Sequence, residues 1–191
     1  MRKPLQFQVI SVKFSSKDIM AGRLMQYHEY LNSARKHQYT CEEVLKLIKG
    51  IELTSGEGKS RHKRLLLNLY YLSGYVVECS VKYAIYHLIA YDRKKCVRQL
   101  DQDGISFQNN IKHHRFEMYA DHLKVRQPGM PLIDDSSNVE RDVLFIYRLW
   151  DAEVRYWFND IPDDHKRKLT ERNIEQFFNL ATQLMKQVER I

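Results

Sequence analysis

The stretch YYLSGYVVECSVKYAIYHL, residues 70–88, decides the fold because it is apolar around most of a helix. It belongs to a helix predicted from about His62 to Asp92, in which apolar residues recur at helical spacing. An apolar arc this wide is typical of the central helix of a bundle. One stripe within it consists of Leu65, Leu69, Leu72, Val76, Cys79 and Tyr83.

The other face of this helix carries a carboxylate, Glu78, one turn after Gly74. Two interpretations remain open. In the first, Glu78 lies on a solvated face and pairs with Lys82, four residues further on. In the second, Gly74 lets another helix come close, and Glu78 holds a group that this helix brings.

The rest of the chain predicts an all-α, single-domain bundle of four to six helices. Residues 1–14 alternate apolar and polar side chains and are expected to form a short strand or an arm, and residues 15–191 to form the bundle. Capping motifs predict helix starts at Thr40, Ser137 and Thr170. Further helices are expected from Ser15 or Ser16 to His37 and from Ile111 to Val125, and the Ser137 helix is expected to run through Trp157.

Composition indicates a soluble protein with an anionic partner. The 191 residues are 43% hydrophobic and 29% charged, and charges interrupt every apolar run before it reaches membrane-spanning length. We therefore expect a cytoplasmic protein without a membrane segment. The net charge of +7 favours RNA, DNA or an acidic protein as the partner. Three widely spaced cysteines are expected to be reduced thiols: Cys41, Cys79 and Cys96.

Motifs for nucleotide triphosphates and metals do not fit. The segment 53–60, LTSGEGKS, has Leu53 where a phosphate-binding loop needs glycine, and helix rather than strand is predicted before it. His113, His114 and His122 lack the spacing of metal ligands. The sequence predicts no cofactor and no metal.

A basic cluster, KSRHKR at 59–64, lies at the predicted start of the central helix. Positive charge is unfavourable at that end of a helix dipole, and a bound phosphate would relieve it. The candidate RNA-binding residues are Lys59, Arg61, Lys63 and Arg64, although a merely solvated cluster is the favoured alternative.

The segment 70–82 resembles the signature helix of the HEPN family (higher eukaryotes and prokaryotes nucleotide-binding). That signature reads aromatic-x-x-x-G-[YA]-x-x-E-x-x-[LV]-K. Here Tyr70 and Tyr71, Gly74, Glu78 and Lys82 fill its places. The segment NIKHHRFEMYADHL and the pair Arg155–Tyr156 resemble two further elements of the family. The resemblance covers about residues 16–190.

The resemblance implies a four- to five-helix bundle, often dimeric, from toxin–antitoxin, phage-defence or RNA-processing systems. Many members are metal-independent ribonucleases with an R-x(4–6)-H motif in the penultimate helix. Others bind RNA, nucleotides or partner proteins, often beside a nucleotidyltransferase. In this chain Arg155 lies in the corresponding region, but the nearest downstream histidine, His165, is too far along for the motif.

Three functions are therefore carried forward. The first is a HEPN-like protein that binds RNA or a nucleotide through the basic cluster, Tyr71, Glu78, Lys82 and Tyr156, as a homodimer or with a cognate nucleotidyltransferase or antitoxin. The second is a metal-independent ribonuclease in which Arg155 stabilises the phosphate and His165 moves protons. The third is a helical module that binds an acidic protein. We also predict that Glu78 and Arg155 form a hydrogen-bonded pair facing a groove or dimer interface.

Overall fold

The structure is a computed structural model that describes residues 25–133, 138–159 and 161–191. The predicted N-terminal arm and the beginning of the first predicted helix lie outside these residues. Within the described residues the protein is mostly helical, which confirms the all-α class. The strands found there are a two-residue antiparallel pair, β1 (Asp101–Gln102) and β2 (Ile105–Ser106).

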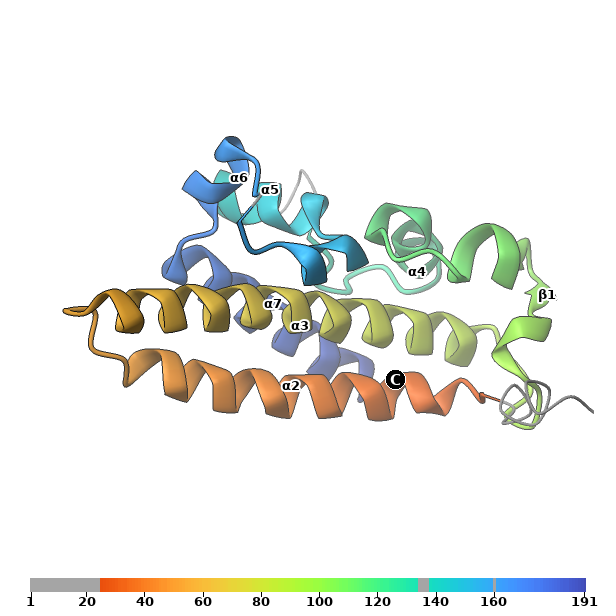
Figure 1. The fold of residues 1–191 in the computed structure, drawn as a ribbon. Coiled ribbons are helices and arrows are strands. Elements are labelled where there is room, and N and C mark those ends of the chain that lie inside the picture. Colours follow the sequence, from red (N-terminus) through yellow and green to blue (C-terminus); the bar gives the residue numbers. More distant parts are fainter. Residues whose placement is uncertain (1–24, 134–137, 160) are drawn as a thin grey trace, which may run out of the picture.

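Three long helices form the main body. Helices α2 (His28–Lys49) and α3 (Gly56–Leu88) lie side by side as an antiparallel hairpin, and α7 (Glu171–Val188) packs against both (Figure 1). The last residues lie near the end of α3, where the backbone oxygen of Ile191 is 3.0 Å from Nε2 of His87. This arrangement makes α3 the central helix, as its wide apolar arc predicts.

Shorter elements cover the side of α3 away from α2 (Figure 1). The helices are α4 (Ala120–Arg126), α5 (Arg141–Leu149) and α6 (Asp163–Lys168). Three single turns precede α4 in the chain: η1 (Val97–Gln99), η2 (Phe107–Ile111) and η3 (Phe116–Met118). A fourth, η4 (Ala152–Tyr156), lies between α5 and α6. With α3 enclosed on both sides, one continuous core runs through the described residues.

Several predicted helix boundaries are wrong. Thr40 does not begin a helix, since its hydroxyl donates to the backbone oxygen of Lys36 at 2.9 Å and α2 continues through it. Helix α3 begins at Gly56 instead of His62, and Ser55 caps it by accepting from the backbone N–H of Gly58 at 3.0 Å. By contrast, Thr170 caps α7 as predicted, with its oxygen 3.2 Å from the N–H of Asn173.

Two predicted helices are interrupted. The region 111–125 splits into η2, η3 and α4, and the residues between η2 and η3 form the loop that carries His114. The region after Arg141 breaks at Trp150, whose backbone is extended. Asp151 then caps η4 by accepting from the N–H of Glu153 at 3.1 Å. Both breaks deliver side chains to the surface of α3.

Candidate functional site

Gly74 marks the closest approach to α3. A Cβ atom here would lie 1.9 Å from Cε2 of Trp150, so the buried indole ring rests directly on the glycine backbone. The indole Nε1 donates to the backbone oxygen of Tyr71 at 3.1 Å. The prediction that Gly74 admits a close neighbour is confirmed, and that neighbour is Trp150.

Glu78 and Lys82 form a buried ion pair. Their side chains are 6% and 3% exposed, and Lys82 Nζ lies 2.7 Å from Glu78 Oε1. Lys82 also donates to the backbone oxygen of His113 at 2.7 Å. The pairing along the helix is confirmed, but the solvated face expected for it is wrong. Buried charges persist only with such partners, and here one partner is the loop between η2 and η3.

His114, in the same loop, completes the coordination of the carboxylate. Its Nδ1 lies 3.2 Å from Oε1 and 3.1 Å from Oε2 of Glu78. An ionised carboxylate only accepts hydrogen bonds, so Nδ1 is the donor in these contacts, and the tautomer that Glu78 selects has Nε2 as its acceptor nitrogen. Because the His114 side chain is 45% exposed, the imidazole connects the buried carboxylate to solvent.

The predicted pair between Glu78 and Arg155 is wrong. Among the described residues, the hydrogen-bond partners of the Glu78 carboxylate are Lys82 and His114. Arg155 is exposed on η4, with its guanidinium carbon 4.7 Å from the ring centre of Tyr156. The break at Trp150 turns Arg155 towards the surface, and Lys82 already compensates the buried charge.

Tyr75 lies at the centre of a group of aromatic rings beside the Glu78–Lys82 ion pair. Its ring centre is 4.9 Å from that of Tyr71, 5.4 Å from His37 on α2 and 6.2 Å from His114. Burial and a hydrogen bond with Tyr71 raise the pKa of Tyr75 well above its ordinary value, while the charge of Arg155 opposes the shift. Tyr75 therefore stays a neutral phenol at physiological pH.

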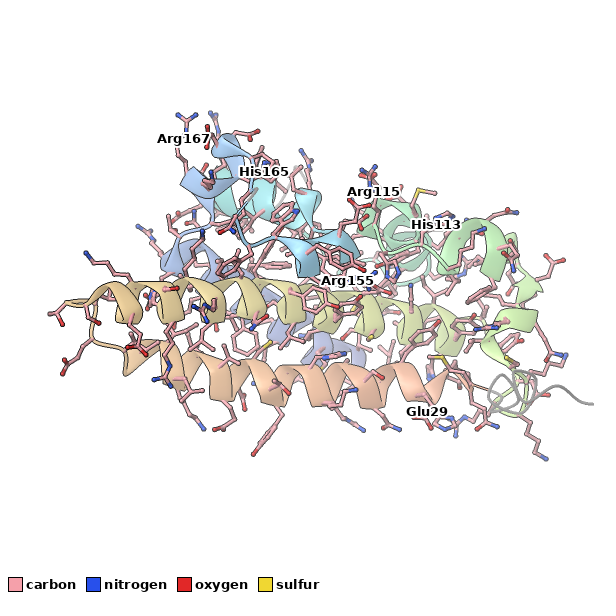
Figure 2. All side chains as sticks on the ribbon, in the orientation of Figure 1. Glu29, His113, Arg115, Arg155, His165 and Arg167 are labelled. Atoms are coloured by element: carbon pink, nitrogen blue, oxygen red, sulfur yellow. The ribbon has the colours of Figure 1, made fainter. Side chains whose placement is uncertain are left out.

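Two exposed arginines belong to this part of the surface: Arg155 beside Tyr71, and Arg115 directly after His114 in its loop. A hydrogen bond with Tyr156, and a weaker contribution from Tyr71, raise the pKa of Arg155. Arg115 Nε lies 3.7 Å from Oδ2 of Asp151, which joins the loop carrying His114 to the start of η4. Figure 2 shows Arg115 and Arg155 on the same side of α3. We call His114, Arg115, Arg155, Tyr71 and Tyr75 the histidine–arginine site.

His165 is not part of this site. It lies on α6 away from Arg155 (Figure 2), with Nδ1 3.0 Å from Asp164 Oδ1. Its ring meets those of Trp157 at 5.2 Å and Phe145 at 5.5 Å between centres. The structure thus does not bring together the two residues predicted to be catalytic.

The basic cluster lies inside α3 rather than at its first residue. All four predicted cations are exposed, but the earlier start at Gly56 moves Lys63 and Arg64 about two turns from the helix end. The argument that a phosphate relieves the helix dipole therefore weakens for these two residues, because dipole effects fade within the first turn. Instead, Lys63 Nζ and Arg64 Cζ each lie 5.6 Å from the ring centre of Phe158.

The sequence did not single out His37, Tyr75, His114, Arg115 or Phe158 as site residues. Tyr75 falls on the helix face of Glu78 and could have been named from its spacing. His114 is 36 residues from Glu78, and no local pattern reports that contact.

Other reactive groups fit structural roles. Burial raises the pKa of Cys41 and of Cys79 to about 12, so neither thiol is a ready nucleophile. In the parts of the chain that the structure describes, no three His, Cys, Asp or Glu side chains are grouped closely enough to hold a metal ion. No described helix is both long enough and apolar enough to cross a membrane.

The site combines an imidazole oriented by a carboxylate, two exposed guanidinium groups and a group of aromatic rings. Searches against protein-family models, curated proteins and solved structures found no match to this chain, so the site has to be interpreted from this chemistry.

Proposed function

We propose that this chain is a HEPN-like RNA-binding protein of a cytoplasmic defence or toxin–antitoxin system. The residues that resemble the family signature support the proposal because they act together. Gly74 seats Trp150, while Glu78 and Lys82 hold the loop that carries His114. In this proposal α2, α3, α5 and α7 correspond to the up-and-down bundle of the family.

The observation that carries the RNA-binding proposal is the exposed pair Arg115 and Arg155 beside His114 and Tyr71. Guanidinium groups bind phosphates well, and they lie here on a protein with net charge +7. An RNA backbone lying across the site would contact both arginines, and its bases could meet the ring of Tyr71. The dimer, and the nucleotidyltransferase or antitoxin partner, belong to the same proposal.

Salt-dependent binding tests this function. We expect fluorescence anisotropy to show binding of a labelled RNA oligonucleotide that weakens steeply as salt rises. Each phosphate contact on a single strand contributes about 0.7 to the slope of log affinity against log salt. The double variant Arg115→Ala/Arg155→Ala should therefore lower the slope by about 1.4.

The matched control is Lys94→Ala/Lys95→Ala, which removes two exposed cations from the turn after α3. It should leave the slope closer to that of the wild type. RNA binding that ignores salt, or no binding at low salt, would contradict the proposal.

A second candidate function, a metal-independent ribonuclease, is favoured by one specific observation: the hydrogen bonds between Glu78 and His114 Nδ1. The carboxylate fixes the tautomer in which Nε2 can accept a proton from a ribose 2′-hydroxyl. The 2′-oxygen then bonds to phosphorus and the bond to the 5′-oxygen breaks. The imidazolium returns the proton to that oxygen, while Arg115 or Arg155 stabilises the phosphorane charge.

Labelled RNA incubated with EDTA tests this second function. We expect the wild type to produce 2′,3′-cyclic phosphate ends and His114→Asn to reduce the rate by about 100-fold or more. His113→Asn, in the same loop, is the control and should retain activity because only its backbone oxygen is used. Intact RNA with the wild type would rule out the nuclease and leave the binding proposal standing.

A further inference from the structure

A second surface of the molecule combines exposed aromatic rings with cations. It consists of Lys63 and Arg64 on α3, Tyr156 at the end of η4 and Phe158 on the segment that follows, and we call it the basic–aromatic face. Tyr156 and Phe158 are 74% and 42% exposed. Both cations of α3 lie 5.6 Å from the ring centre of Phe158.

Buried neighbours hold the backbone that carries these two rings. Tyr156 is the last residue of η4, and the backbone then becomes extended at Trp157, with φ −73° and ψ 120°. Trp157 turns inward, with its ring centre 6.4 Å from that of buried Tyr70, and Ile161 is buried further along. The inward residues hold the segment against the core, and Tyr156 and Phe158 are displayed in consequence.

The cations of this face are not occupied by carboxylates. Among the residues that the structure describes, no Asp or Glu lies within ion-pair distance of Lys63 or Arg64, and Arg64 donates only to Ser60 Oγ at 3.0 Å. Three described acidic groups of the adjoining segments have other partners: Glu171 pairs with His62, Asp163 with Lys166, and Asp164 with His165. Within the described part of the chain, Lys63 and Arg64 therefore carry positive charge beside an exposed ring without a carboxylate partner.

The shape of the face favours a polymer over a free nucleotide. The hollow next to Lys63, lined also by Lys166 and Ile161, has a volume of about 230 Å³. Small-molecule sites usually have about 300–1,000 Å³ and enclose most of the ligand. An open platform of rings with cations around it is the arrangement that binds single strands, because unpaired bases stack on the rings and phosphates meet the cations.

We propose that the basic–aromatic face binds a single-stranded polynucleotide through stacking of its bases on Tyr156 and Phe158, with Lys63 and Arg64 on its phosphates. A duplex does not fit this mode, because its bases are already stacked on one another. Since Arg155 directly precedes Tyr156, the same strand continues into the histidine–arginine site. The inference rests on the proposed function and names the class of nucleic acid that it takes.

The test measures anisotropy of labelled single-stranded RNA with the full chain and with Tyr156→Ala/Phe158→Ala. Each ring removed should weaken binding by about fivefold or more. Tyr39→Ala is the matched control, because Tyr39 is 64% exposed on α2 and lies outside the face. It should bind like the wild type. Circular dichroism confirms that each variant is folded.

Four further probes separate base stacking from attraction by charge alone. Duplex RNA and an abasic strand of equal length should bind the wild type more weakly, and the double variant should lose little affinity for either. Binding of single-stranded DNA is measured in parallel, and the strand that the wild type binds more tightly identifies the natural polymer. A loss of affinity for that strand in the double variant, without a similar loss for the duplex or the abasic strand, supports stacking. Polyglutamate that displaces the strand at equal charge concentration would instead indicate an acidic protein partner and overturn the inference.

The two proposals fail in different ways. If the wild type binds neither RNA nor single-stranded DNA at low salt, the proposed function fails together with this inference, whereas binding of single-stranded DNA alone contradicts only the proposed function. If the wild type binds with a steep salt dependence while Tyr156→Ala/Phe158→Ala is unchanged, only the stacking face is wrong.

Discussion

The two ends of α3 carry charge in opposite settings. In the second half, Glu78 and Lys82 are enclosed by α2, η3 and the loop of His114, and every charged atom there has a partner. In the first half, Lys63 and Arg64 face solvent and an exposed ring. The same helix thus uses buried charge to position a loop and leaves other charge exposed to solvent, and the covering elements make the difference.

The largest expected effect comes from breaking the buried pair. Lys82→Met leaves Glu78 without its ammonium partner and should reduce the free energy of unfolding by about 3–5 kcal/mol. Glu78→Leu/Lys82→Met removes both charges and should lie closer to the wild type than the single variant. Urea denaturation measures both. Lys63→Met, at the exposed end, should change stability by no more than about 0.5 kcal/mol. A cost below about 1 kcal/mol for Lys82→Met would mean that the pair is solvated.

The next effect concerns the close approach at Gly74. Gly74→Ala puts a Cβ where the Trp150 ring lies, so the indole must shift and lose its bond to Tyr71. We expect a loss of about 3 kcal/mol, at the upper end for overpacking, with a change in tryptophan fluorescence. Gly56→Ala is the control at the exposed end, where nothing lies within 4 Å of the added atom. Equal stability of the two variants would contradict the contact.

A smaller effect on stability is expected at the start of α3, in its exposed first half. Ser55→Ala removes the cap on Gly58 and should lower stability by about 1 kcal/mol. Its neighbour Thr54, exposed and outside the cap, provides the control Thr54→Ala. If both substitutions have the same effect in urea denaturation, α3 does not begin where Ser55 places it.

The smallest effect is a pH dependence beside the buried pair. Burial, with the charge of Lys36, lowers the pKa of His37, and burial with Arg126 lowers that of His122. The unfolded chain therefore binds more protons below pH 6.5, so stability should decline as the pH falls from about 7.5 through the folded-state pKa values. His37→Gln should flatten this decline, as measured by urea midpoints at several pH values. An unchanged slope would show that His37 does not contribute.

Local pattern predicted much of the architecture. The apolar period of α3 and α7 and the cap at Thr170 were available from sequence because they depend on neighbours within a few turns. The glycine at position 74 indicated a close approach, but it did not identify Trp150 as the neighbour. Thr40 misled for the same reason: its capping signal is local, whereas the continuity of α2 comes from packing against α3.

The candidate site could be predicted only in part. The sequence placed Glu78, Lys82 and Tyr71 on one face of α3. The position of Arg155, however, depends on the break at Trp150, and this break follows from the docking of the indole on Gly74. The partner of Glu78 comes from a loop 36 residues away. Contacts of this range are decided by tertiary packing, and no helical periodicity encodes them.

The regular rise of α3 sets the distances between the groups that contact it. Arg64, Tyr71 and Glu78 are seven residues apart, so each interval measures about 10 Å along the axis. Phe158 lies beside Arg64, Arg155 beside Tyr71, and His114 beside Glu78. A strand held at Phe158 must therefore extend about 20 Å to reach the imidazole, and an oligonucleotide shorter than that span engages one end or the other but never both.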